Sequence, residues 1–173
     1  FPHIESLELE STRITDDGLL QLKGLKSLTT LSLFRSEGIT NAGLEHLCPL
    51  VKLQSLDLGS TSISDAGLVH LKGLRGLQFL NLIGTSVTDA GLAHIKGLKE
   101  LRTLSLEGPA IADAGLVHLQ GLTELETLSF DNSKITDPGL THLKGMTHLQ
   151  YLRLSNTAVT DSGLEHLKDL TNL

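Results

Sequence analysis

A twelve-residue motif recurs along the chain and constrains the fold more than any other feature. It reads "VTDAGLAHIKGL" from Val87 to Leu98, and variants of it occur in six other places. Aligned on this motif, the sequence divides into seven units at a spacing of 24 residues, except that the second unit has 25. The units begin at Ile4, Leu28, Leu53, Leu77, Leu101, Leu125 and Leu149. A fixed period in this range indicates a solenoid whose units pack only on their neighbours, so we expect residues 1–173 to form a single repeat domain.

Each unit predicts one short strand followed by one short helix. The first half, for example "LQFLNL" at Leu77 to Leu82, alternates apolar residues with others, as a half-buried strand does. The second half is expected to form the helix, because a Thr or Ser stands where a helix N-cap is needed and an Asp usually follows at the positive end of the helix dipole. A Gly such as Gly97 comes about two turns later, where it can end the helix. The expected caps are Thr15, Thr40, Ser64, Thr88, Thr136 and Thr160, with Ala112 in the fifth unit.

Stacking these units predicts a curved α/β solenoid. Neighbouring strands lie about 4.8 Å apart, whereas packed helices need about 10 Å between their axes. The stack therefore bends, with a parallel sheet on the concave face and the helices on the convex face.

The complete unit, L-x-x-L-x-L-x-x-T-x-I-T-D-x-G-L-x-H-L-K-G-L, resembles a leucine-rich repeat. It is similar to the helical subclass found in ribonuclease-inhibitor-like proteins, F-box substrate receptors and many bacterial arrays. The resemblance implies a leucine-rich repeat solenoid and a role in protein binding. The family's usual Asn or Cys in the turn after the strand is replaced here, so we expect a ladder of hydroxyl side chains that is broken at Pro109. The replacing residues are Thr12, Thr61, Thr85, Pro109, Ser133 and Thr157.

Composition excludes several classes of function. The net charge of −6 and the absence of a Lys/Arg cluster in the sequence argue against nucleic acid. No apolar stretch is long enough to span a bilayer, so membrane insertion is not expected. The single cysteine, Cys48, cannot form an internal disulfide, which slightly favours the cytoplasm but also fits a bacterial surface or secreted protein. The chain begins with Phe1 rather than Met, which we interpret as a processed form or a piece of a longer protein.

A histidine row on the helices does not predict a metal or catalytic site. Equivalent residues on neighbouring helices start about 10 Å apart, whereas zinc needs its ligands within about 2.1 Å. The Ser and Thr residues of the strands and turns lie away from this row, so no nucleophile is expected to reach a base. We therefore expect no cofactor and no enzyme activity, with the row serving helix packing. Its members are His46, His70, His94, His118, His142 and His166.

The concave face carries the predicted binding site. The third, fifth and seventh residues of each unit point out of the sheet, and they vary while the structural positions hardly change. Phe34, Gly59 and Ile83 come from consecutive strands, which predicts a shallow apolar slot between the Phe and Ile side chains. The extra residue in "FRSEGIT" is expected to bulge the strand exit beside Arg35. The partner-binding residues predicted are Phe34, Arg35, Asp57, Gly59, Phe79, Asn81, Ile83, Glu107, Tyr151 and Arg153.

The predicted partner is a protein or peptide that offers an apolar side chain flanked by Lys or Arg. Chance exposure without a partner stays an alternative reading of the slot. Two other functions also stay open: a structural or cell-surface spacer, and the targeting segment of a larger enzyme or ubiquitin-ligase-like protein. Both ends lack a polar terminal cap, so Leu7, Leu9, Leu152 and Leu154 should be partly exposed and could drive self-association.

Overall fold

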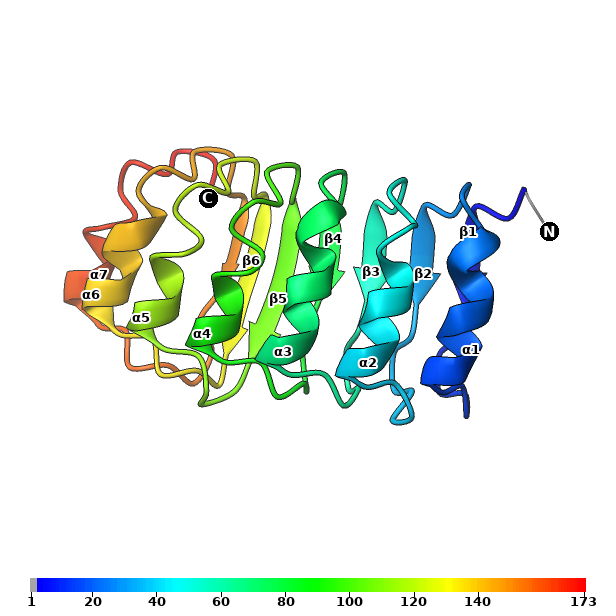
Figure 1. The fold of residues 1–173 in the computed structure, drawn as a ribbon. Coiled ribbons are helices and arrows are strands. Elements are labelled where there is room, and N and C mark those ends of the chain that lie inside the picture. The colour runs from blue at the N-terminus through cyan, green and yellow to red at the C-terminus, as the bar shows by residue number, and fades with distance from the viewer. Residues whose placement is uncertain (1–2) are drawn as a thin grey trace.

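The computed structural model describes residues 3–173, and each repeat in it contributes a strand and a one-turn helix (Figure 1). Phe1 and Pro2, the start of the predicted domain, lie outside the described residues. The strands are β1 Ser6–Glu8, β2 Thr30–Ser32, β3 Ser55–Asp57, β4 Phe79–Asn81, β5 Thr103–Glu107, β6 Thr127–Asp131 and β7 Tyr151–Arg153. The α-helices are α1 Asp16–Leu20, α2 Asn41–Leu44, α3 Asp65–Leu68, α4 Asp89–Leu92, α5 Asp113–Leu116, α6 Asp137–Leu140 and α7 Asp161–Leu164.

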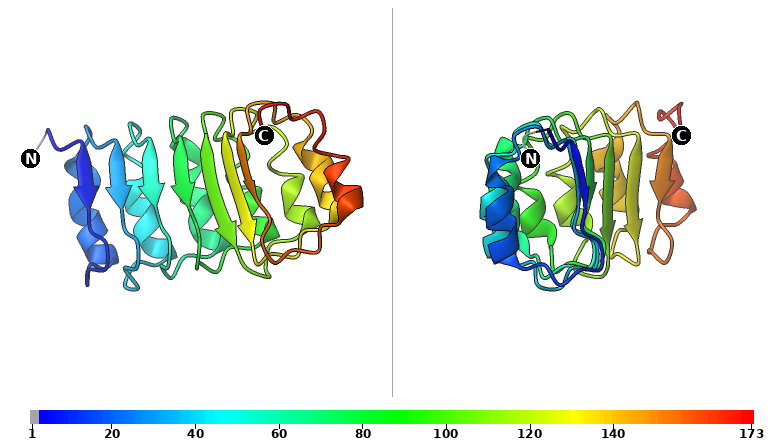
Figure 2. Two further views of the ribbon diagram at one scale, coloured as in Figure 1. Left: turned by 180° about the vertical axis from the view of Figure 1, so that it is seen from behind. Right: turned by 90° about the vertical axis from the view of Figure 1, so that its right-hand side faces the viewer.

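The strands form one parallel sheet in the order β1 to β7, and every strand pairs with its equivalent in the next repeat. Leu56 on β3, for example, lies opposite Leu80 on β4. The sheet lines the inner side of the bend, and the helices lie along its outer side (Figures 1 and 2). The predicted curved α/β solenoid with a parallel sheet is confirmed.

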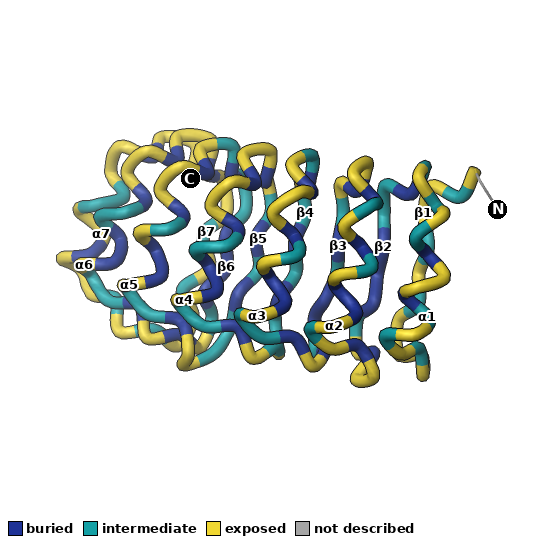
Figure 3. Tube along the Cα trace, in the orientation of Figure 1, coloured by how far each residue is buried: buried dark blue, intermediate teal, exposed yellow. Residues whose placement is uncertain are grey.

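One continuous apolar core runs between the sheet and the helices (Figure 3). It consists mainly of the leucines that open each repeat, those that point inward from each strand, and those on the inner side of each helix, such as Leu53, Leu56 and Leu68, all fully buried. At both ends the equivalent leucines have a neighbour on one side only, and they are half-buried, as expected. The half-buried end leucines are Leu7, Leu9, Leu152 and Leu154.

The helices end differently from the expectation. Most continue into a short 3-10 turn, as in η1 Gln21–Gly24, η2 Glu45–Leu47, η3 Val69–Gly73 and η4 Thr141–Leu143. In the described chain the left-handed backbone conformation occurs elsewhere, at the eighth position of every repeat, with φ between 54° and 98°. The glycines expected to end the helices do so in two repeats, where Gly24 and Gly73 are the last residues of η1 and η3, but without a left-handed backbone. The left-handed residues are Ser11, Arg35, Ser60, Gly84, Gly108, Asn132 and Asn156.

Among the described residues, the hydroxyls expected to form a ladder after the strands link two repeats only at Ser36, whose Oγ donates to the carbonyl of Leu9 in the first repeat at 2.9 Å. Instead, Thr61 Oγ1 donates to the carbonyl of Leu58, three residues earlier in its own repeat, at 2.6 Å. Thr12, Thr85 and Thr157 form the same local bond. The threonine side chain therefore closes the turn that follows four of the strands, which explains why a β-branched hydroxyl residue recurs there.

The side-chain ladder between repeats lies instead at the helix N-termini. Asp65 Oδ1 accepts a hydrogen bond from the backbone N–H of Thr88 in the next repeat, and Oδ2 accepts from the Thr88 hydroxyl, both at 2.7 Å. Of the expected capping hydroxyls, only those of Thr40, Thr88 and Thr160 also accept from their own helix, at 3.3 Å. The Thr and Asp that recur in the repeats thus join neighbouring repeats. This carboxylate ladder comprises the pairs Asp16–Thr40, Asp65–Thr88, Asp89–Ala112, Asp113–Thr136 and Asp137–Thr160, with Asn41–Ser64 as an amide equivalent.

The glycine two residues after each Asp makes room for this ladder. A Cβ at Gly91 would lie closer than 3.0 Å to the Asp65 carboxylate, a separation that Cβ atoms essentially never show. A Cβ at Gly115 would meet the Asp89 carboxylate in the same way. The Gly of the D-x-G part of the motif is therefore explained by the close approach of the Asp carboxylate from the preceding repeat.

None of the described helices could cross a bilayer, since the longest α-helix has five residues.

Candidate binding surface

The concave face is formed by the outward positions of the seven strands, visible from the sheet side in Figure 2 (left). On β5 the residues alternate between buried and half-buried, so Thr103, Ser105 and Glu107 face outward while Leu104 and Leu106 enter the core. The outward residues vary from strand to strand, and they fall into two groups.

The first group lies around Gly59 and differs from the open slot that was expected. Gly59 is buried, because a ring carbon of Phe34 and the amide nitrogen of Asn81 lie within 2.8 Å of the place that a Cβ would take. Asp57 Oδ1 fixes this arrangement by accepting from the Gly59 N–H at 2.8 Å and from Asn81 Nδ2 at 3.0 Å. The Phe34 side chain thus fills the gap beside Gly59 and forms a half-buried apolar platform on the face.

Arg35 extends this platform. Its guanidinium lies 5.1 Å from the centre of the Phe34 ring, within the range of a cation–π interaction. The extra residue of this repeat does not bulge the strand: β2 keeps its register with β3, and Glu37 and Gly38 absorb the insertion in the following loop. Arg35 owes its position to its left-handed backbone, with φ of 58°.

The second group surrounds a hollow of about 370 Å³ over β4, β5, β6 and β7. It brings together three residues of the predicted site, Ile83, Glu107 and Arg153. Sequence reasoning missed the other lining residues because it followed the aromatic side chains. Glu107 and Asp131, acidic residues at the seventh position of consecutive strands, were the available signal. The missed residues are Ser105, Thr127, Ser129, Asp131 and Asn132.

The two carboxylates of this hollow have different partners. Asp131 accepts from Arg153 Nε at 2.8 Å and from the Ser155 N–H at 2.8 Å. Burial acts to raise the pKa of Asp131, but the hydrogen bonds from Ser155 and Arg153 and the charge of Arg153 outweigh it, so the pKa lies below its ordinary value. Glu107 accepts from the neutral amide of Asn132 at 2.7 Å. Asp131 is therefore neutralised by an ion pair, whereas Glu107 forms no ion pair with any described residue.

The remaining predicted residues divide between these two groups. Phe79 is half-buried on β4, on the same strand as Asn81. Tyr151 is 66% exposed on β7, the strand that also carries Arg153. The structure thus places Phe34, Arg35, Asp57, Gly59, Phe79 and Asn81 in the first group, and Ile83, Glu107, Tyr151 and Arg153 in or beside the second.

The histidine row lies on the helical side and its members are half-buried. One of them, His142, has its Nδ1 2.6 Å from Gln120 Nε2 of the preceding repeat. No group of three or more metal-ligating side chains occurs among residues 3–173. These contacts fit a packing role for the row.

Comparisons with family models and with solved structures place the chain among known proteins. The family model described as a leucine-rich repeat matches residues 2–22, 51–71 and 145–168. The structure of internalin C2 from Listeria monocytogenes is similar, with 31% sequence identity and a TM-score of 0.82 over 99% of this chain and 70% of that one. No curated protein sequence matches the chain.

A second solved structure, the internalin InlF of Listeria monocytogenes, has a TM-score of 0.77. Its sequence identity is 23%, so it supports the fold alone. The alignment covers 99% of this chain and 47% of that one.

Proposed function

Because the chain belongs to the leucine-rich repeat family, we propose that it is a non-catalytic scaffold that binds a protein or peptide on its concave face. Leucine-rich repeat proteins are generally protein-interaction scaffolds. The observation that carries the proposal is the hollow over β4 to β7, where an apolar side chain and a carboxylate lie together on a face whose backbone is held rigid by the repeat.

The residues of the hollow favour a partner with a basic side chain next to an apolar one. Ile83 supplies an apolar wall, and Glu107 supplies a charge that no cation of the chain pairs with among the described residues. A Lys or Arg of the partner would form a charge-assisted hydrogen bond with Glu107. The Phe34 and Arg35 platform, with Phe79, offers a second contact of the residue types that dominate interface hot spots.

The same residues argue against catalysis at this face. The hollow holds hydroxyls and carboxylates but is lined by no histidine, cysteine or lysine that could activate a nucleophile. The imidazoles lie on the helical side, across the apolar core. A binding function therefore accounts for the site better than an enzymatic one.

A peptide selection tests the proposal without a known partner. Random twelve-residue peptides displayed on phage are selected on the immobilised chain, and we expect enrichment of Lys or Arg beside Leu, Ile or Phe. Binding of the selected peptides should fall about tenfold or more in Glu107→Gln and in Ile83→Ser, since each removes a central contact.

Glu45→Gln provides the matched control, because Glu45 is an exposed carboxylate on the helical side. It should bind the peptides as well as the parent chain, and the thermal melts of all three variants should stay close to the parent's. Selected peptides that bind Glu107→Gln and Ile83→Ser undiminished would remove the site from this face.

A further inference from the structure

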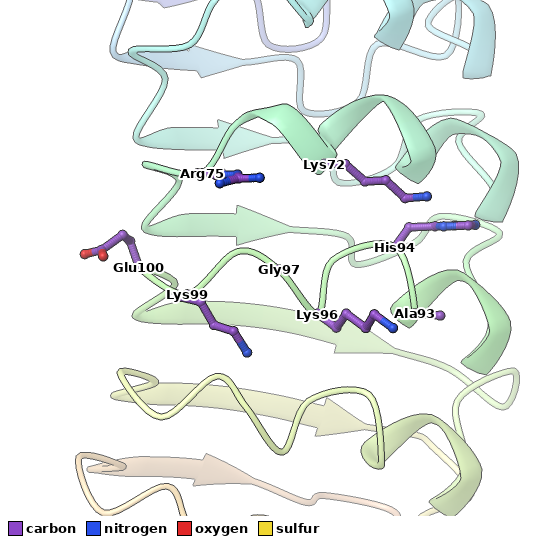
Figure 4. Close-up of a pocket in the computed structure, with 8 residues that line it drawn as sticks. All are labelled: Lys72, Arg75, Ala93, His94, Lys96, Gly97, Lys99 and Glu100. Carbon is purple, nitrogen blue, oxygen red and sulfur yellow. The ribbon is translucent and has the colours of Figure 1, made fainter.

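A second hollow, of about 440 Å³, lies on the outer side of the solenoid between the third and fourth repeats (Figure 4). Its walls come from the segment that follows α3 and from the segment that follows α4. The sequence shows no Lys/Arg cluster, and these cations lie together because the repeat period places residues of neighbouring units side by side. The lining residues are Lys72, Arg75, Ala93, His94, Lys96, Gly97, Lys99 and Glu100, which we call the basic hollow.

The charge of the basic hollow opposes that of the whole protein. Four cations and one carboxylate line it, in a chain with a net charge of −6. Lys72, Arg75 and Lys96 form no salt bridge with any described residue. Lys99 Nζ donates to the carbonyl of Gly121 at 2.9 Å, which holds it across to the fifth repeat. The like charges repel one another, so an anion bound between them would relieve this repulsion.

The hollow has room for more than one anionic group. A Cβ at Gly97 would meet nothing within 4 Å, and Ala93 adds little bulk to the wall. A neighbouring hollow of about 530 Å³ shares Lys96, Gly97 and Lys99 and continues to His118 and Gln120. Lys96 and Lys99 therefore line both hollows, each of a size typical for small ligands, while the Lys99 ammonium group is held at the Gly121 carbonyl.

The neighbouring repeats limit the length of the ligand. The position of Lys72 and Lys96 is occupied by Cys48 in the second repeat and by Gln120 in the fifth. The position of Arg75 and Lys99 is likewise occupied by the neutral residues Val51 and Thr123. The basic surface thus ends after two repeats, whereas a nucleic acid would need a longer basic stripe. A compact, multiply charged ligand fits better.

We propose that the basic hollow binds a small ligand that carries two or more closely spaced phosphate groups. Lysine ammonium and arginine guanidinium groups form charge-assisted hydrogen bonds with phosphate oxygens, and Arg75 can do so with two oxygens at once. This site lies on the helical side, away from the concave face, so it does not depend on the function proposed above.

Inorganic tripolyphosphate, titrated calorimetrically at low salt, tests the proposal on the whole chain. We expect binding to the parent chain, and Lys72→Gln/Lys96→Gln should weaken it at least about tenfold because two charge-assisted contacts are lost. The control, Lys23→Gln/Lys26→Gln, removes two cations at the equivalent positions of Lys72 and Arg75 in the first repeat. It should change the affinity less than about twofold, as expected for distant charges that salt screens.

Vesicles of phosphatidylcholine with and without phosphatidylinositol bisphosphate separate the two sources of such a ligand. Capture by the phosphorylated vesicles that is lost in Lys72→Gln/Lys96→Gln would assign the site to a lipid headgroup. Binding of tripolyphosphate without vesicle capture would assign it to a free phosphorylated molecule. No binding of tripolyphosphate by the parent chain, or equal weakening in both double variants, would overturn the proposal.

Discussion

Replacing Ala112 by threonine should stabilise the protein, because Ala112 leaves the carboxylate ladder incomplete. Asp89 receives only the backbone N–H of Ala112, at 2.8 Å. In the preceding step Asp65 receives both the N–H and the hydroxyl of Thr88. The backbone of Ala112 is extended, with φ of −143° and ψ of −177°, which a β-branched residue adopts readily. The new hydroxyl would reach Asp89 Oδ2 in the geometry that Thr88 already shows.

The expected gain follows from this one hydrogen bond. A hydrogen bond to a charged group contributes about 1.5–3 kcal/mol in proteins, and the half-buried position and the ordering of the Thr side chain reduce it. We expect the free energy of unfolding to rise by about 1 kcal/mol, a size also typical of helix caps. For a chain of this length that corresponds to a rise in Tm of about 2–4 °C.

Urea and thermal unfolding followed by circular dichroism measure this change, and Ala112→Val is the matched control. Valine has the shape of threonine without the hydroxyl, so it should give none of the gain. Equal stabilisation by both variants would show that packing or strand propensity is the cause. An unchanged or lower Tm for Ala112→Thr would refute the reasoning from the ladder.

Three further predictions concern the interior contacts and the ends of the array. Gly91→Ala should lower the free energy of unfolding by about 2 kcal/mol, because the new Cβ displaces the Asp65 carboxylate. Gly97→Ala is the control, since a Cβ there meets nothing within 4 Å, and it should change the free energy of unfolding by less than about 0.5 kcal/mol. Equal effects of the two variants in urea unfolding would contradict this. The side-chain and backbone hydrogen bonds from Thr160 hold the pKa of Asp137 below its ordinary value of 3.8, so the stability that they contribute is present above that value and is lost as the pH falls through the lower folded pKa. Thr160→Ala should move the pKa of Asp137 back toward 3.8 in an NMR titration, and no shift would exclude the hydroxyl as its cause. The half-buried leucines at both ends should make the chain self-associate at high concentration, and a strictly monomeric species in sedimentation would speak against it.

The repeat pattern predicted the fold because the residues of each unit are enough to indicate its strand and its helix. The alternation around Leu56 and Leu80 placed both strands, and the period placed them side by side. That residues 1–173 form a single domain stays a prediction. The ladder could not be read from one unit, since Asp65 bonds to a residue that lies 23 positions further along the chain. The interpretation of this Asp as a charge that interacts with the helix dipole was incomplete for that reason.

The candidate site was predicted less well, because its shape depends on side-chain conformations. Phe34 and Gly59 do lie on the concave face, but the pattern could not show that the ring would cover the glycine. The hollow around Glu107 depends on Arg153 pairing with Asp131 one strand away, which no alternation pattern encodes. Positions set by the backbone were predictable, and contacts between outward side chains were not.

The left-handed turn at the end of every strand restricts how such an array can diversify its recognition. All seven residues at this position share a conformation that most side chains avoid, and six of them are Ser, Gly or Asn. The eighth position of each repeat, at the rim of the concave face, therefore carries few residue types. The third, fifth and seventh positions carry aromatic, acidic and basic residues alike. New specificities can arise through the strands without disturbing the backbone. Arg35 is the exception: a large side chain lies there in a left-handed backbone conformation, beside Phe34, so this is the one rim position that presents a cation.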